Sequence, residues 1–431
     1  SLEYKANVPL AAGYLKAYFD ANFPQKFSID ILPRIFTDLL NTDAIISEIL
    51  RRNPDILAFS LYLWNIEKSL YIAEKIKEKS PDIDIIFGGP EVNEDNHYLL
   101  NNPIFEKGIS GEGEIGFMAY LIGKEKSKIK GFIDKKGYSN FSHKNLEDFR
   151  CEYNPYLQNI IEKNHDKTMY FETVRGCPFS CRFCYYNKQY DKLIKIPTQC
   201  IKNLYEKAIN EGYEEIFLLD PSFNVQPGFS DIIKLLKDLN KDKKIEFITE
   251  LRADLLTKEE IKDLSEMNLK DVEIGLQSTN PKALEAMNRK QDLGKFAENT
   301  TFMQSMGINC KVDLIVGLPG DDLEHFKRSV NWVKEKGLER DAQVFNLSIL
   351  SGTDFSKNGK KLGLSYQMKP PYYLLSHSTF TNEDIYEAFQ YASEIFDIQF
   401  DPVSEPLLSK NYSSLNQIGR ASCRERVFRT V

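Results

Sequence analysis

Three cysteines crowded into eight residues are the part of this sequence best suited to chemistry. Cys177, Cys181 and Cys184 have the spacing CxxxCxxC and come directly after a short apolar run. Three thiolates on one tight loop can hold three irons of a four-iron cluster and leave the fourth iron without a protein ligand. A structural zinc site is the alternative, but zinc normally takes four ligands, and neither Cys200 nor His165 lies at a suitable spacing. The spacing therefore favours a [4Fe-4S] cluster with one open position.

Six short apolar runs accompany this loop, and stretches of helical length separate them. Each run has the length and the residue types of a strand. The runs are residues 169–174, 215–219, 245–249, 272–276, 312–316 and 344–350. Six strand and helix units in order predict a (β/α)6 partial TIM barrel over residues 167–355. In such folds the reactive groups lie at the carboxyl ends of the strands.

The N-terminal part, residues 1–123, predicts a separate Rossmann-like α/β domain. Residues 56–60 and 83–87 have strand character, and residues 65–79 between them carry apolar side chains at helical spacing. Ligands of such sheets lie beyond the carboxyl ends of the strands. The residues expected at this binding edge are Ser60, Tyr62, Gly88 and Gly89. The neighbouring Trp64 is expected in the core of the domain rather than in a cavity.

The remaining segments have weaker patterns. Residues 124–166 lack clear periodicity and predict a connector. Residues 356–417 predict a small, mainly helical C-terminal cap. Residues 418–431 change from a Lys-dominated to an Arg-dominated composition and indicate a tail that is foreign to the protein.

Charge and composition restrict the partners and the compartment. The net charge of −7 argues against a general nucleic-acid binder, which would carry a basic face. The sequence has neither a secretory leader nor an apolar run long enough to cross a bilayer. Seven cysteines in 431 residues are too few for a disulfide scaffold. We therefore expect a cytoplasmic protein that binds no membrane and no nucleic-acid polymer.

The cysteine loop and its neighbours, RGCPFSCRFCY at 175–185, resemble the radical S-adenosylmethionine (SAM) superfamily, and the resemblance spans residues 167–355. It implies that SAM chelates the open iron and is cleaved reductively to a 5′-deoxyadenosyl radical. It also implies that Phe183 packs on the cluster and that the backbone around Tyr185 meets the adenine. An electron donor such as flavodoxin or ferredoxin would be the redox partner.

Further motifs at the ends of the later strands resemble SAM-binding segments of that superfamily, in the expected order. The second strand ends in DPSF, the third in ELRAD, the fourth in EIGLQS, the fifth in VGLPG and the sixth in SGT. The SAM contacts that these motifs imply are Asp220, Ser222, Glu250, Arg252, Glu273, Gln277, Ser278 and Gly317. A surface ion pair is the alternative for Glu250 with Arg252.

The N-terminal domain resembles cobalamin-binding domains fused to radical SAM barrels. Ser60, the glycine pair at 88–89 and the GEGE segment at 111–114 carry this resemblance. The family's DxHxxG segment is absent, and no histidine precedes His97, so that loop offers no histidine ligand to cobalt. Whether cobalamin binds is therefore left open, and the alternative is a domain that only supports the barrel.

Two functions follow from these resemblances. The overall layout resembles the clostridial lyase that releases queuine from queuosine or its 5′-phosphate, which implies a small-molecule substrate such as a modified nucleoside or nucleotide. Arg289 or Lys311 would then meet a phosphate. The alternative is a cobalamin-dependent radical SAM methyltransferase. A cluster used only for structure or electron transfer would leave the SAM-binding motifs unexplained.

Overall fold

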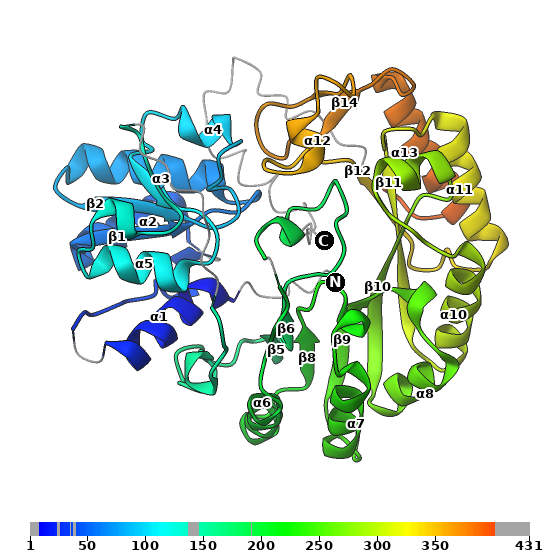
Figure 1. Ribbon diagram of the computed structural model, residues 1–431, viewed down its shortest axis with the longest axis horizontal. Coiled ribbons are helices and arrows are strands. Elements are labelled where there is room, and N and C mark those ends of the chain that lie inside the picture. The colour runs from blue at the N-terminus through cyan, green and yellow to red at the C-terminus, as the bar shows by residue number, and fades with distance from the viewer. Residues whose placement is uncertain are drawn as a thin grey trace.

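The computed structural model describes residues 8–23, 26–34, 36–37, 40–136, 146–190 and 192–400. They form two α/β units side by side, with the N-terminal unit on the left of Figure 1 and the larger unit on the right. The segment predicted to be a foreign tail, 418–431, lies outside the described residues.

A four-stranded sheet with the order β1-β2-β3-β4 forms the N-terminal unit. The first three strands are parallel, and β4 is antiparallel to β3. The elements are α1 (Leu10–Asn22), α2 (Thr42–Arg52), β1 (Ile56–Ser60), α3 (Ile66–Lys79), β2 (Asp84–Gly88), α4 (His97–Leu100), β3 (Lys107–Ile109), α5 (Gly113–Leu121), η2 (Lys126–Lys128) and β4 (Phe132–Asp134). The predicted Rossmann-like fold is confirmed. β4 lies beyond the boundary predicted at residue 123, because a strand of three residues is too short to show a periodic pattern.

Capping residues set where several helices begin. At the start of α2, the Asn41 side chain accepts a hydrogen bond from the backbone N–H of Ala44. At the start of α8 (Lys258–Glu266), Thr257 and Glu260 form a capping box, in which each side chain accepts from the other residue's backbone N–H. These local bonds fix the helix ends that flank the strands.

The larger unit is built on a six-stranded sheet with the order β12-β11-β10-β9-β8-β5, in which all neighbours are parallel. Its strands are β5 (Thr168–Phe171), β8 (Glu215–Leu218), β9 (Glu246–Leu251), β10 (Leu269–Gln277), β11 (Asn309–Val316) and β12 (Gln343–Asn346). The other helices of this sheet are α6 (Thr198–Glu211), α7 (Phe229–Leu239), α9 (Pro281–Ala286), α10 (Leu293–Ser305) and α11 (Leu323–Glu335). All six predicted strands are present, and the partial barrel is confirmed.

The first predicted strand, 169–174, is the one that differs from expectation. The chain leaves the sheet after Phe171, and β6 (Val174–Arg175) pairs instead with β7 (Ile194–Lys195) as a short antiparallel ladder. The break occurs because the buried Asp220 carboxylate accepts hydrogen bonds from the backbone N–H groups of Thr173 and Val174, at 2.9 and 2.7 Å. The cysteine loop therefore starts from its own two-stranded base.

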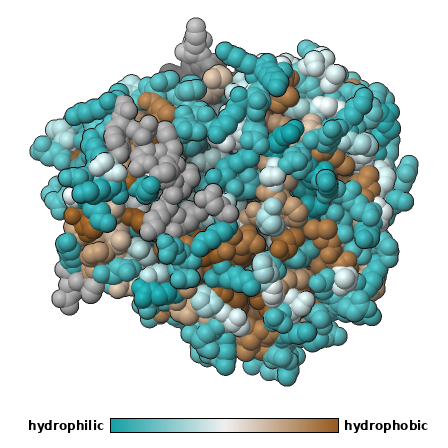
Figure 2. Space-filling model, viewed as in Figure 1, coloured by the Kyte–Doolittle hydropathy of each residue, from teal (hydrophilic) through white to brown (hydrophobic). Residues whose placement is uncertain are grey.

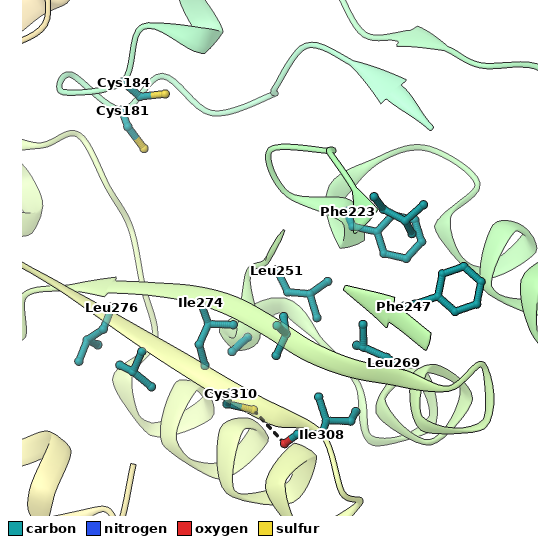
Figure 3. Close-up of a cluster of buried hydrophobic side chains, with 14 of the residues drawn as sticks. Cys181, Cys184, Phe223, Phe247, Leu251, Leu269, Ile274, Leu276, Ile308 and Cys310 are labelled. Atoms are coloured by element: carbon teal, nitrogen blue, oxygen red, sulfur yellow. Dashed lines mark hydrogen bonds between the residues drawn. The ribbon is translucent and has the colours of Figure 1, made fainter. Parts of the chain in front are cut away.

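The pleat of β10 gives the sheet two different faces. The residues that are fully buried in the core are Val272, Ile274 and Leu276. The residues between them line a cavity at the carboxyl end of the sheet, and they are Glu273, Gly275 and Gln277. Figure 3 shows Cys181 and Cys184 on a loop across β10 from Cys310. The strand thus separates the cavity from the core.

The C-terminal cap contains α12 (Asp354–Lys357), the antiparallel pair β13 (Ser365–Tyr366) and β14 (Leu374–Ser376), and α13 (Asn382–Phe396). Helices make up most of its regular structure, and residues 401–417 of the predicted cap lie outside the described residues. Hydrophilic residues cover most of the face in Figure 2, whereas hydrophobic residues gather near its middle, over the six-stranded sheet. The structure also joins Cys151 to Cys200 in α6 by a disulfide, a pair that the sequence did not predict.

No helix within the described residues is both long enough and apolar enough to cross a membrane.

The glycine pair at the end of β2, Gly88 and Gly89, offers a test of this fold. Gly89 has φ +92°, and a Cβ placed on it would lie 2.5 Å from the Leu61 carbonyl oxygen, whereas a Cβ on Gly88 would meet nothing closer than 3.8 Å. We expect Gly89→Ala to lower the free energy of unfolding by about 2 kcal/mol or more, because alanine is strained at positive φ and would press on the backbone. Gly88→Ala is the matched control, and equal losses in urea denaturation of both variants would contradict this explanation.

Candidate active site

The cysteine loop runs from β6 to the short helix η4 (Tyr186–Lys188) and opens onto the cavity at the carboxyl ends of the strands. Cys177, Cys181 and Cys184 all line this cavity, and their thiols are free. Burial raises the pKa of Cys184 to about 12, so this thiol stays protonated until a metal displaces its proton. Three free thiols from one loop fit the donor set of a [4Fe-4S] cluster with one open position.

Most of the predicted SAM contacts lie in the same cavity. The predicted residues that line it are Phe183, Ser222, Glu250, Arg252, Glu273 and Gln277. They come from the cysteine loop and from the ends of three successive strands, as expected for a parallel barrel. Their contacts with SAM remain predictions.

Two carboxylates stand next to each other on this wall. Glu250 of β9 and Glu273 of β10 are direct partners in the parallel register, so their side chains leave the sheet on the same face. Both line the cavity. Their negative charge suits a cationic group, such as the ammonium of an amino acid.

Arg252 is held by Asp254, a residue to which the sequence gave no role. Its Nε and Nη2 donate to the two carboxylate oxygens of Asp254, each at 2.9 Å, and Nη2 also donates to the Lys290 carbonyl at 2.7 Å. Arg252 and Asp254 are both buried, and the guanidinium lies 4.7 Å from the Phe179 ring centre. The alternative of a surface ion pair with Glu250 is therefore wrong, because this arginine is buried and bound to Asp254.

Gln277 has the clearest features of a ligand-binding residue. It is buried, it has φ +66°, and its Oε1 has no hydrogen-bond partner among the described residues. A non-glycine residue in the left-handed region and an unsatisfied buried oxygen are both costly. Strain of this kind concentrates where a ligand binds.

Asp220 lies outside the residues that line the cavity. Its carboxylate accepts from the Thr173 hydroxyl at 3.0 Å as well as from the two backbone N–H groups at the base of the cysteine loop. Burial raises its pKa to about 7. The structure therefore gives Asp220 a role in fixing the loop, while its contact with the SAM amino group remains a prediction.

Three other predicted contacts also lie away from the cavity lining. The Ser278 hydroxyl donates to Asp321 at 3.0 Å. The Tyr185 ring occupies the space beside Gly352, where a Cβ would lie 2.4 Å from it. Gly317 leaves similar room for Leu374. The structure thus gives Ser278 a hydrogen-bonding role and gives Tyr185 and Gly317 packing roles, and the SAM contacts of these three residues remain predictions.

Arg289 and Asp313 also line this cavity. The sequence suggested Arg289 only as a contact for a substrate phosphate, and it suggested no site role for Asp313. Arg289 donates to the Gly275 carbonyl at 2.5 Å, and burial together with Arg252 lowers its pKa. Asp313 accepts from Gln343 at 3.2 Å, and burial together with Glu273 raises its pKa. A charged residue inside an apolar strand was the available signal for Asp313. Arg289 follows a short helix and gave no such signal.

The expected binding edge of the N-terminal sheet contributes no residue to the lining of this cavity. Ser60 and Gly88 are partners in the β1–β2 register, so two small residues end adjacent strands. Tyr62 stacks on Trp64 with ring centres 4.7 Å apart, and Trp64 is 55% exposed. The expectation that Trp64 belongs to the core is wrong, because the loop turns it outward.

The GEGE segment contacts the barrel directly. Arg175 Nη1 donates to Glu112 at 3.0 Å and to Glu114 at 2.7 Å, and its Nε donates to Glu172 at 2.8 Å. Burial, and then the charge of Glu114, raise the pKa of Glu112 to about 7. This buried group of charges joins the two units beside the cysteine loop.

Two family models match the chain. The model described as Radical SAM superfamily matches residues 171–333 and includes the cysteine loop. The model described as B12 binding domain matches residues 6–121.

Curated relatives match at low identity. The 2-(S-pantetheinyl)-carbapenam-3-carboxylate methyltransferase of Streptantibioticus cattleyicolor is 23% identical over 84% of this chain and 56% of its own length. The cobalamin-dependent radical SAM methyltransferase TokK of Streptomyces tokunonensis is 23% identical over 80% of this chain and 54% of its own length. The chain therefore spans about half the length of these relatives.

Solved structures share the fold. The radical SAM methyltransferase TsrM from Kitasatospora setae, with cobalamin and a [4Fe-4S] cluster bound, has a TM-score of 0.72 at 12% identity and covers 91% of this chain and 88% of its own. The cobalamin-dependent radical enzyme OxsB, with aqua-cobalamin bound, has a TM-score of 0.70 at 15% identity and covers 89% and 64%. The arrangement of an α/β domain before a partial barrel is thus confirmed.

These comparisons correct two interpretations of the sequence. The resemblance to the queuine-releasing lyase is not supported, because it rested on layout alone, and this layout is shared with methyltransferases. The match to a B12 binding domain favours cobalamin, which the missing histidine had left open.

The role of Asp220 can be tested by removing its acceptors. Asp220→Ala leaves two buried backbone N–H groups without acceptors. It also removes the acceptor of the Thr173 hydroxyl, which keeps only the bond that it accepts from Gln226. We therefore expect the free energy of unfolding to fall by about 3 kcal/mol or more. We also expect fewer irons per chain after anaerobic reconstitution. Asp242→Ala, at an exposed site, is the control and should change stability by less than about 0.5 kcal/mol. Equal effects of the two substitutions would refute the role.

The raised pKa of Glu112 predicts a pH dependence of stability. Between its ordinary value of about 4.3 and about 7, the folded chain holds a proton that the unfolded chain has lost, so stability falls as pH rises through this window. We expect Glu112→Gln to gain stability relative to the parent chain on going from pH 5 to pH 8. Asp220 contributes equally to both proteins and cancels in this difference. Parallel stability curves from urea denaturation would show that Glu112 titrates normally.

Proposed function

Because the chain belongs to the radical SAM superfamily and carries an N-terminal domain of the B12-binding family, we propose that it is a cobalamin-dependent radical SAM methyltransferase acting on a small molecule. The observation that carries the proposal is the direct attachment of this domain to the cysteine loop. Arg175, two residues before Cys177, is bound by Glu112 and Glu114 of the N-terminal unit. A group held by that domain would therefore lie beside the cavity.

The cavity supplies the parts that SAM binding requires. When bound to Cys177, Cys181 and Cys184, a [4Fe-4S] cluster supplies the electron for reductive cleavage of SAM. We assign the SAM ammonium to the carboxylates of Glu250 and Glu273. The free amide oxygen of Gln277 would accept a further donor from SAM.

The same cavity limits the access of water. Phe183 is buried, and Phe179 stacks against Arg252 on the same wall. Apolar walls around the reacting atoms protect a reactive intermediate from side reactions with solvent. In this proposal the aromatic residues exclude water, and the charged residues orient SAM.

Cobalamin fits the edge of the N-terminal sheet. Ser60 has a small side chain and Gly88 has none, and the two residues end adjacent parallel strands. A Cβ on Gly88 would make only ordinary van der Waals contacts, with backbone oxygens at 3.8 and 3.9 Å. Ligands of such sheets bind at this edge. When bound there, cobalamin supplies the methyl group, and the chain's own residues hold it by the carboxyl ends of β1 and β2.

The substrate class follows from the relatives only in general terms. The relatives include a methyltransferase named for a carbapenam carboxylate, and TsrM was solved with a tryptophan substrate. For this chain we propose a small organic substrate and an external electron donor such as flavodoxin or ferredoxin.

The cluster assignment has a matched pair of variants. We expect Cys181→Ala to abolish the visible absorbance of the cluster and to reduce 5′-deoxyadenosine formation to background, because one of three iron ligands is lost. Cys310→Ala removes a thiol that is also buried and free but lies on the core side of β11, and it should retain both signals. SAM cleavage that persists in Cys181→Ala would overturn the assignment.

The methyltransferase proposal is tested by the cobalamin content and the SAM products. Protein produced with hydroxocobalamin should retain about one cobalamin per chain, and Cys181→Ala should retain it equally, because the two sites use different residues. With SAM, reductant and a methyl acceptor, both 5′-deoxyadenosine and S-adenosylhomocysteine should form. No cobalamin bound at saturation, with 5′-deoxyadenosine as the only SAM product, would contradict the proposal.

A further inference from the structure

Arg175 connects parts of the chain that are far apart in sequence. It lies in β6, two residues before Cys177. Its guanidinium donates across the domain boundary to Glu112 and Glu114, at 3.0 and 2.7 Å, and within its own domain to Glu172, at 2.8 Å. One side chain thus links the base of the cysteine loop to the start of α5.

This contact is buried, unlike an ordinary surface ion pair. The side chains of Arg175, Glu112 and Glu114 are 5%, 4% and 7% exposed. Removing one partner of a buried pair leaves a charge without compensation, whereas exposed pairs contribute little. The separation of the two units at this point is therefore strongly opposed.

Aromatic rings fix the direction of the same guanidinium. Its centre lies 4.7 Å from the ring centre of Tyr14 in α1 and 5.5 Å from that of Phe149. The Glu112 carboxylate is held in turn, because the backbone N–H of Leu146 donates to it at 2.6 Å. The geometry of the contact is thus set by several segments at once.

The loop base is fixed from the other side as well. Asp220 accepts the backbone N–H groups of Thr173 and Val174, and Gly176 follows Arg175 with φ +97°. A movement of Arg175 would therefore be passed to Cys177 across a single glycine. No other residue at this base is bonded by both units among the contacts described.

We propose that Arg175 is a positioning residue that locks the cysteine loop to the N-terminal domain and so fixes the separation between the metal site and the ligand edge of that domain. The importance of this lock for catalysis rests on the function proposed above, in which the N-terminal domain holds cobalamin. A cluster held by the three cysteines and a cobalamin held at that edge would then be kept at a fixed separation.

Two conservative variants distinguish the interdomain contact of Arg175 from its contact within its own domain. Glu114→Gln and Glu172→Gln each keep the shape of the side chain and remove one charge-assisted bond to Arg175. Only the bond of Glu114 crosses the domain boundary. We expect Glu114→Gln, in anaerobically reconstituted holoenzyme, to change the magnetic coupling between cob(II)alamin and the reduced cluster, as seen in the relaxation of the cob(II)alamin EPR signal. Glu172→Gln should leave that coupling as in the parent protein.

A second readout does not depend on cobalamin. Amide hydrogen exchange of residues 174–186 should become about tenfold faster or more in Glu114→Gln than in Glu172→Gln, because loss of one charge-assisted bond weakens the interdomain contact by that order. Equal exchange rates and equal coupling in the two variants would overturn the proposal. If the parent protein retains no cobalamin, the proposed function fails, and the exchange measurement alone still decides whether the lock exists.

Discussion

The alternation of side chains along a parallel strand is the constraint on which the rest of this structure depends. In β10, every second residue is apolar and packs in the core, whereas Glu273 and Gln277 face the cavity. The same rule places Asp313 on the cavity side of β11, because its register partner is Gly275. Six parallel strands thereby build a stable core and a polar site from one set of elements. The cysteine loop has only to cover the carboxyl end of this sheet for its thiols to meet the polar residues.

This constraint explains which features the sequence could predict. The strands were found because each combines apolar side chains with a fixed length. Most cavity residues were found because motifs at the strand ends resemble SAM-binding segments, and for Glu273 the cost of a charge inside an apolar strand was a further signal. The thiols of Cys177, Cys181 and Cys184 were found from spacing alone. All of these signals are local, so they survive in a single sequence.

The features that sequence reasoning missed depend on contacts between distant segments. The bond of Asp220 to the base of the cysteine loop spans 47 residues, and that of Arg175 to Glu114 spans 61. Contacts between residues so far apart in the sequence leave no periodic pattern of residue types from which they could be predicted. The bond of Arg252 to Asp254 was missed for a related reason, since Glu250 and Asp254 are equally near Arg252 in sequence and only the turn of the backbone selects Asp254. The three residues of β4 and the outward turn of Trp64 also follow from packing rather than pattern.

Buried carboxylates mark the part of the fold where a backbone position must be fixed closely. Burial raises the pKa values of both Asp220 and Glu112 to about 7, so each carboxylate is less stable in the folded chain than in water. A fold gains nothing from such groups by burial alone, and apolar residues of similar size would commonly serve stability as well. Both carboxylates nevertheless bond to the few residues that precede Cys177, one from each side. Directional hydrogen bonds fix a backbone position more narrowly than apolar packing does, and the loop that carries the thiols is where a small displacement would separate the reactive groups.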